Sequence, residues 1–211
     1  MQYKRFSLGA LWTNGYLFWD DNTRDAFFID PGGKTKTVKN FIEANNLNLK
    51  MILLTHGHID HIAGIHELVQ YVGDNIYIGK NDAFMLKNPS RELQELLGVN
   101  CDGLENFKTV EEGQELEFSG CKIKVLETPG HTEGSVCYLI TDDDGHKILI
   151  SGDTLFAQSV GRTDLEGGDS LKLENSLKRL AEFNDSLHVL PGHGPDTSIG
   201  EERELNPYWP R

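Results

Sequence analysis

Residues 51–61 read MILLTHGHIDH, an apolar run followed directly by several histidines and an aspartate. MILLT (51–55) is a mostly apolar run, typical of a strand that is buried on both faces. Four potential metal ligands follow it, His56, His58, Asp60 and His61. The two histidines at 56 and 58 point the same way in an extended segment, while Asp60 and His61 begin a helix and can turn toward a second ion. A helix-capping loop would explain one such residue, but four together favour a metal site.

Three more candidate ligands occur in a similar setting, each at a glycine-rich turn after a predicted strand. They are His131 in TPGHTEGS, Asp153 in ISGDTLF and His193 in LPGHGP. Each alone is weak, because an aspartate after a strand is more often a turn residue. Because all three repeat one arrangement, we expect the seven side chains to meet at one edge of a β-sandwich.

The remaining pattern predicts one mixed domain over residues 1–211, with no linker or repeat. Strands are expected at 6–9, 15–19, 25–29, 51–55 and 75–78, and later in ELEFSG, CKIKVLETPG, SVCYLIT, KILISGD and LHVLPGHG. Helices are expected at 35–46, 62–71, 169–183 and 198–206, with two short ones in 80–98 that Pro89 separates. In the helix at 169–183, the apolar side is predicted to carry Leu171, Leu177, Leu180 and Phe183.

Composition limits the partners and the compartment. The chain has 211 residues, is 38% hydrophobic and carries a formal net charge of −13. Such a surface repels phosphate backbones and anionic lipids, so we expect neither nucleic acid nor a membrane as a partner. The three cysteines, Cys101, Cys121 and Cys137, are odd in number and widely spaced, which suits free thiols in the cytoplasm.

In order along the chain, the motifs THGHIDH, TPGHTEGS, SGDTLF and PGHGP resemble the metallo-β-lactamase superfamily from about Ile29 to the C-terminus. The resemblance implies an α+β fold, a four-layer αββα sandwich with a dinuclear site at one edge of its sheets. His56, His58 and His131 would hold the first metal, and Asp60, His61 and His193 the second, with Asp153 bridging them. The expected cofactor is two divalent ions, zinc first, with iron or manganese as alternatives.

Seven ligands, one of them shared, leave a position between two ions for a hydroxide. Two divalent ions lower the pKa of a shared water from about 15.7 to about 7, so that it can attack a carbonyl at neutral pH. A thioester suits this chemistry because a thiolate leaves with little help from a general acid. Asp60 is also a candidate for moving the proton during turnover.

The stretch GDTLFAQSVGRTDLEGGD is similar to the small stand-alone type of glyoxalase II-like hydrolase, which lacks the C-terminal helical domain that binds glutathione. The expected substrate is a small-molecule thioester such as S-lactoylglutathione. No cysteine lies near Asp153, where some true β-lactamases have one, which disfavours antibiotic hydrolysis. The alternatives are a mononuclear-iron persulfide dioxygenase of the same superfamily and a non-catalytic metal-binding protein on this fold. The oligomeric state is not indicated.

Two residues are candidates for supporting roles around the ligands. Asp30, in FFIDPGG, is expected either to accept a hydrogen bond from a ligating histidine or to serve only as a strand-end turn. Arg162, in VGRTDL, is expected either to contact the substrate or, more simply, to form an ion pair with Asp164. Phe156, Met85 and Tyr208 are expected to pack in the core, with a place in the pocket wall as the alternative.

Overall fold

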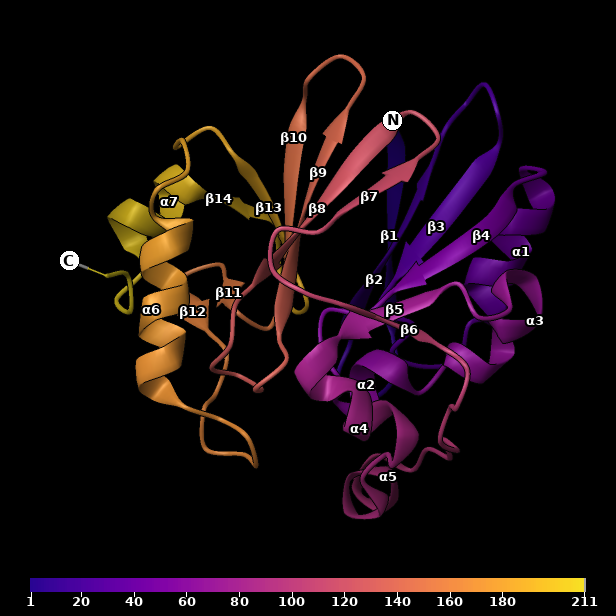
Figure 1. The fold of residues 1–211 in the computed structure, drawn as a ribbon, viewed down its shortest axis with the longest axis horizontal. Coiled ribbons are helices and arrows are strands. Elements are labelled where there is room, and N and C mark those ends of the chain that lie inside the picture. Colours follow the sequence, from indigo (N-terminus) through magenta and orange to yellow (C-terminus); the bar gives the residue numbers. More distant parts are fainter. Residues whose placement is uncertain (211) are drawn as a thin grey trace.

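A computed structural model describes residues 1–210, in which two six-stranded sheets lie face to face with helices on their outer sides (Figure 1). The first sheet has the strand order β1 (Gln2–Leu8), β2 (Thr13–Trp19), β3 (Asp25–Ile29), β4 (Asn48–Leu53), β5 (Ile76–Gly79) and β6 (Lys108–Val110). The second has the order β14 (Thr197–Ser198), β13 (His188–Pro191), β10 (Lys147–Gly152), β9 (Val136–Asp142), β8 (Cys121–Glu127) and β7 (Glu115–Phe118). A small hairpin pairs β11 (Leu155–Phe156) with β12 (Ser159–Val160).

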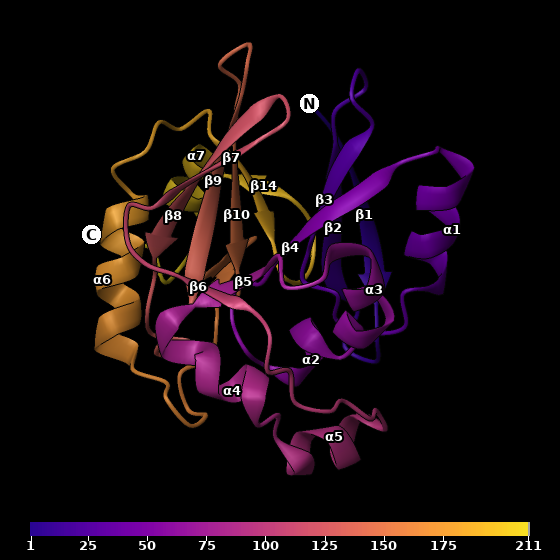
Figure 2. The same ribbon diagram turned by 45° about the vertical axis from the view of Figure 1, so that its right-hand side comes forward.

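Helices cover the outer face of each sheet (Figure 2). On the side of the first sheet lie α1 (Lys36–Ala44), α2 (Ile59–Ile62) and α3 (Val69–Val72), with α4 (Ala83–Lys87) and α5 (Arg91–Leu97) at one end. On the side of the second lie α6 (Ser170–Leu180) and α7 (Ile199–Leu205). No helix in residues 1–210 is both long and apolar enough to cross a membrane.

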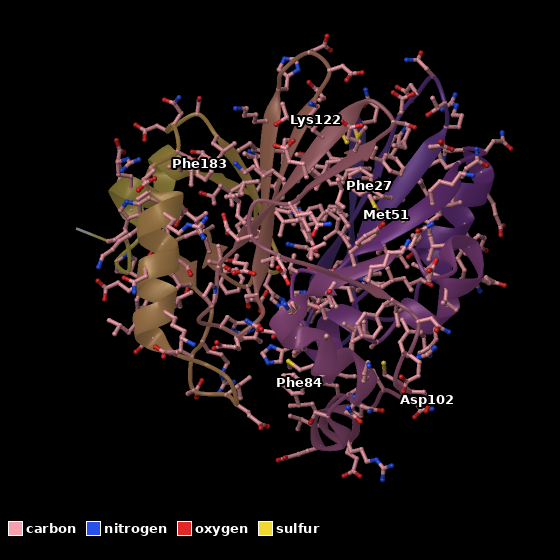
Figure 3. The ribbon with its side chains drawn as sticks, in the orientation of Figure 1. Phe27, Met51, Phe84, Asp102, Lys122 and Phe183 are labelled. Carbon is pink, nitrogen blue, oxygen red and sulfur yellow. The ribbon has the colours of Figure 1, made fainter. Side chains whose placement is uncertain are left out.

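Three apolar layers hold these four layers of structure together. Strand β4 shows the principle, because Ile52 packs toward the helices and its neighbour Leu53 packs between the sheets. The layer between the sheets contains Phe27 and Met51, which are labelled between the two sheets in Figure 3. A third layer joins the second sheet to Leu177 and Leu180 of α6. The predicted αββα sandwich is therefore confirmed.

Strand direction brings the candidate ligands to one edge. Strands β10 and β13 run parallel, so the residues that follow them, Asp153 and His193, lie at the same end of the sheet. Strand β9 runs antiparallel to β10, so the segment before β9, with His131, reaches that end as well. The Val136 N–H donates to the Thr55 carbonyl at 2.8 Å and joins this edge to the end of β4 in the other sheet.

Two predicted helices differ from those observed. The helix expected at 62–71 is broken into α2, a 3-10 turn at Ile65–Glu67 and α3. The break occurs because the Gly64 N–H donates at 2.7 Å to the Pro31 carbonyl rather than within a helix. In α6 the prediction for Leu171 was wrong: this side chain is 65% exposed, while Leu173 is buried instead. Asp169 caps the helix N-terminus, which leaves Leu171 in the first turn facing solvent.

Candidate metal centre

The structure brings all seven predicted ligands together at the sheet edge. Their potential ligand atoms form three overlapping groups, within each of which the atoms lie no more than 4.8 Å apart. One group contains His56, His58 and His131, the second contains Asp60, His61 and His193, and the third joins His56, His61 and Asp153. The first two groups are the two triplets that the superfamily resemblance implied.

The first group consists of buried imidazoles. His58 Nδ1 lies 2.9 Å from His131 Nε2, so two ring nitrogens face one another directly. His56 Nε2 is buried and forms no hydrogen bond within residues 1–210. The three histidines thus present nitrogen atoms toward one small volume.

The second group mixes a carboxylate with two imidazoles. Asp60 Oδ2 lies 3.2 Å from His193 Nε2 and 3.5 Å from His61 Nε2. Asp153 reaches both groups: its Oδ1 lies 3.3 Å from His61 Nε2 and its Oδ2 lies 3.5 Å from His131 Nε2. Its position between the groups is the one expected of a bridging ligand.

The buried polar atoms of this cluster and their chemistry fit divalent cations. Within residues 1–210, His56 Nε2 and Asp153 Oδ1 are both buried and form no hydrogen bond of good geometry, although Asp153 Oδ1 lies 3.3 Å from His61 Nε2; this is costly for polar atoms in a protein interior. Imidazole nitrogen and carboxylate oxygen are the ligands that zinc, iron and manganese accept. A cation at each triplet would satisfy these atoms.

The opposite nitrogens of the rings are held by the surrounding chain. His61 Nδ1 lies 3.0 Å from Asp30 Oδ2, and His56 Nδ1 lies 3.1 Å from Thr55 Oγ1. His131 Nδ1 lies 2.7 Å from the Arg162 carbonyl, and His193 Nδ1 lies 3.2 Å from the Leu11 carbonyl. Contacts of this kind fix the orientation and the tautomer of a ligating histidine.

Asp30 and Arg162 contribute to the centre in different ways. Asp30 is buried and accepts hydrogen bonds from the Thr55 backbone N–H at 2.8 Å and from its hydroxyl at 2.7 Å, in addition to its contact with His61. The guanidinium of Arg162 instead pairs at the surface with both oxygens of Asp164, at 2.7 and 2.8 Å. Only the backbone carbonyl of Arg162 touches the candidate ligands.

The electrostatics of the two groups differ. Burial, together with the neighbouring imidazoles, lowers the pKa of His56 well below its ordinary value and that of His58 to about 4. Burial acts the same way on His61, but Asp153, Asp60 and Asp30 outweigh it and raise the pKa of His61 well above the ordinary value. His56 and His58 therefore offer neutral imidazole nitrogens, and the carboxylates of Asp60 and Asp153 supply the negative charge that a cation would neutralise.

Two supporting residues, Thr13 and Asp82, carry no signal in the sequence. Thr13 donates its hydroxyl to Asp60 Oδ2 at 3.1 Å, and Asp82 accepts hydrogen bonds from both loops that carry the first group. Neither residue belongs to a recognisable motif, and no local pattern distinguishes either from an ordinary turn residue. Their roles depend on contacts between segments far apart in the chain.

Of the three side chains expected in the core, none is fully buried: Phe156 and Met85 are half-buried, and the expectation was wrong for Tyr208, which is 60% exposed. The Phe156 ring centroid lies 6.0 Å from that of His193, and Met85 packs tightly against Gly57. A cavity of about 580 Å³ lies between α6 and the segment 159–164, and Tyr208 lines it. Because Gly161 in this segment packs against Asp153 and His131, the cavity borders the centre.

Comparisons with known proteins agree with this geometry. Residues 9–193 match the Metallo-beta-lactamase superfamily. Hydroxyacylglutathione hydrolase GloC of Haemophilus influenzae is 36% identical over 94% of this chain and 93% of its own length. The crystal structure of the B3 metallo-beta-lactamase BLEG-1 is 31% identical, with a TM-score of 0.88 over 98% of this chain and 99% of its own. TTHA1623, crystallised in a di-iron-bound form, is 33% identical, with a TM-score of 0.84 over 97% of this chain and 99% of its own. With the sandwich, the seven clustered side chains and the match over most of its length, the chain belongs to the metallo-β-lactamase superfamily.

Proposed function

We propose that this chain is a binuclear metal-dependent hydrolase that cleaves small-molecule thioesters of the S-lactoylglutathione type. The observation that carries the proposal is the seven-residue cluster, complete and arranged in two triplets around Asp153. The similarity to hydroxyacylglutathione hydrolase GloC, which extends over nearly all of both chains, supports the choice of substrate.

The residues would divide as follows. His56, His58 and His131 would hold one ion and Asp60, His61 and His193 the other, with Asp153 contacting both. Two divalent ions in these positions supply Lewis-acid polarisation of a carbonyl and activation of water at neutral pH.

The protein's own side chains orient the Asp60 carboxylate, which would accept and release the proton. Thr13 and His193 both contact Asp60 Oδ2, so this oxygen has a fixed orientation toward the second group. Burial raises the pKa of the Asp60 carboxyl, but His61 and His193 outweigh burial and hold that pKa well below its usual range, so Asp60 stays ionised and would accept a proton only transiently during turnover. A thiolate leaves without being protonated first, so the reaction needs no further acid at the sulfur.

A second candidate is β-lactam hydrolysis, which the similarity to BLEG-1 favours. Its leaving group is an amide nitrogen, which must gain a proton. The chemistry would therefore place a heavier demand on Asp60 than thioester cleavage does. The absence of a cysteine near Asp153 in the sequence argues only against the β-lactamases that have one there, so the proton demand of the leaving nitrogen is the main argument against this candidate.

One set of assays separates these activities. The purified protein is tested with S-lactoylglutathione and with a chromogenic cephalosporin, before and after a chelator and then after added zinc. We expect thioester hydrolysis that the chelator abolishes and zinc restores, with far slower cephalosporin turnover. Thioester turnover that survives full metal removal, or turnover of the cephalosporin alone, contradicts the proposal. Oxygen uptake with glutathione persulfide would instead favour the iron dioxygenase.

A further inference from the structure

Asp82 is a fully buried carboxylate that is not one of the seven candidate ligands. It ends the 3-10 turn Lys80–Asp82 between β5 and α4. No lysine, arginine or histidine in residues 1–210 forms an ion pair with it, and burial raises the pKa of its carboxyl despite three hydrogen bonds that lower it. A buried carboxylate without a cationic partner is costly, so the hydrogen bonds that Asp82 accepts must offset this cost.

Those contacts join the two loops that carry the first group. Asp82 Oδ2 accepts from the Gly57 N–H at 2.9 Å and from the Thr132 hydroxyl at 2.7 Å. Gly57 immediately precedes His58, and Thr132 immediately follows His131. One oxygen atom therefore lies between the neighbours of the two histidines whose ring nitrogens face each other at 2.9 Å. The other oxygen, Oδ1, accepts from the Gly134 N–H at 2.7 Å.

The packing leaves little freedom around this carboxylate. A Cβ atom at Gly134 would lie 2.2 Å from the Asp82 backbone nitrogen and 2.6 Å from its Oδ1. A Cβ atom at Gly57 would lie 2.6 Å from the Met85 Cβ. Both loops can sit this close to the turn only because glycine occupies these positions, so their distance from Asp82 is fixed by close contact as well as by hydrogen bonds.

The second group is anchored elsewhere. Asp30 contacts His61, and Thr13 contacts Asp60, while within residues 1–210 Asp82 accepts no hydrogen bond from Asp60, His61 or a residue next to them. Asp82 therefore supports only the first triplet, whereas Asp30 contacts His61 directly and reaches His56 through the Thr55 hydroxyl. Changes at Asp82 should act on one triplet more than on the other.

We propose that Asp82 is a positioning residue that sets the spacing of His58 and His131 and thereby the metal affinity of the first group. This inference rests on the proposed binuclear centre. Replacing the carboxylate by an amide puts an NH₂ group where an acceptor is needed: Oδ2 serves two donors and Oδ1 a third, so Asp82→Asn leaves at least one donor without a partner in either orientation. Residues that orient metal ligands in this way typically contribute about 10- to 100-fold to metal affinity.

The test is stepwise zinc binding, measured by competition with a chromophoric chelator, together with the thermal unfolding temperature of each metal-free protein. In Asp82→Asn we expect one of the two zinc-binding steps to weaken by about 10- to 100-fold and the other to stay unchanged. Thr132→Val removes a single hydroxyl and should weaken the same step, while Thr132→Ser keeps the hydroxyl and should restore it. This pair provides the test if Asp82→Asn does not fold.

Glu202 offers a matched control. It is also a buried carboxylate with three hydrogen-bond donors, from the Gln158 N–H, the Thr197 hydroxyl and the Asn206 amide, and it contacts none of the seven ligands. Glu202→Gln should lower thermal stability and leave both zinc-binding steps unchanged.

Three outcomes overturn the inference. Unchanged zinc binding in Asp82→Asn and Thr132→Val contradicts the role of Asp82 alone. Equal weakening of both steps, matched by Glu202→Gln, shows that Asp82 acts only through general stability. Failure of the wild-type chain to bind zinc, iron or manganese contradicts the proposed function and this inference together.

Discussion

Asp153 is the candidate ligand that contacts both triplets. Its Oδ1 contacts His61 and its Oδ2 contacts His131, and within residues 1–210 the buried Oδ1 forms no hydrogen bond of good geometry. A single side chain therefore reaches both proposed ion positions. Each of the other six candidate ligands belongs to one triplet, and His56 and His61 also group with Asp153.

Asp153→Ala should remove this link. We expect metal content per chain to fall and thioester turnover to drop by at least about 100-fold, the scale of losing one preorganised electrostatic group in an active site. Far-UV circular dichroism should keep its wild-type shape, because the side chain lies outside the three apolar layers. The control is Asp74→Ala, an exposed carboxylate remote from the centre, which should behave as wild type. Wild-type turnover in Asp153→Ala would refute the bridging role.

Asp30 acts on the other side of the ligand rings. Asp30→Asn replaces a carboxylate that accepts hydrogen bonds from Thr55 and lies 3.0 Å from His61 Nδ1. We expect metal affinity to fall by about 10- to 100-fold and the free energy of unfolding to fall by about 1–3 kcal/mol, because a buried donor loses its acceptor. Zinc competition and urea unfolding measure the two effects. If both quantities match those of the wild type, Asp30 is only a strand-end turn residue.

At the scale of the element, helix α6 contains two leucines with opposite environments, one buried and one exposed. Leu180 is 1% exposed within the third apolar layer, whereas Leu171 is 65% exposed. We expect Leu180→Ala to reduce the free energy of unfolding by about 2–5 kcal/mol, since it leaves a cavity. Leu171→Ala should change it by no more than about 0.5 kcal/mol. Urea unfolding of the two variants measures the difference, and equal effects would contradict the packing described for α6.

The elements also show which parts of the fold a sequence can predict. The strand–turn–ligand repeats at Asp153 and His193 were predictable because each depends only on an apolar run followed by small residues. The break in the helix after Ile62 was not, because it follows from a hydrogen bond between Gly64 and the distant Pro31 carbonyl. Patterns along the chain record local periodicity, and contacts between separate segments leave no mark in them.

The same distinction holds within the site. The seven candidate ligands, which the structure brings together, could be named from their motifs, since imidazoles and carboxylates at several strand ends are unusual. Thr13 and Asp82 could not, because a threonine and an aspartate in turns are ordinary and acquire their roles only when the sheets pack. Superfamily resemblance provided the grouping into triplets, which the residues alone had left open.

At the scale of the whole molecule, three buried thiols make stability depend on pH. Burial raises the pKa of Cys101 to about 11, of Cys121 to about 12 and of Cys137 to about 11. Below about pH 8.5, the thiols are protonated in the folded and the unfolded chain alike. Above it the unfolded chain loses thiol protons first, so the free energy of unfolding falls as pH rises toward the folded pKa values, by up to about 1.4 kcal/mol per thiol and pH unit.

Urea unfolding between pH 8 and pH 10 measures this loss. The variant with all three cysteines replaced by alanine is the control, and its stability should fall less steeply over the same range. Identical slopes in the two proteins would show that the thiols are not buried in the folded state. Thiol reagents should likewise react slowly with the native protein and rapidly with the unfolded chain.

The proposed binuclear metal centre is built from seven side chains, and the metal content per chain is the first quantity to measure. Protein purified without added metal is analysed by elemental mass spectrometry, with the protein concentration measured independently. We predict two divalent ions per chain, of zinc, iron or manganese, and a lower content in Asp153→Ala. A chain that holds a single iron would contradict the binuclear hydrolase and favour oxygen chemistry, and a chain that binds no metal would contradict the account altogether.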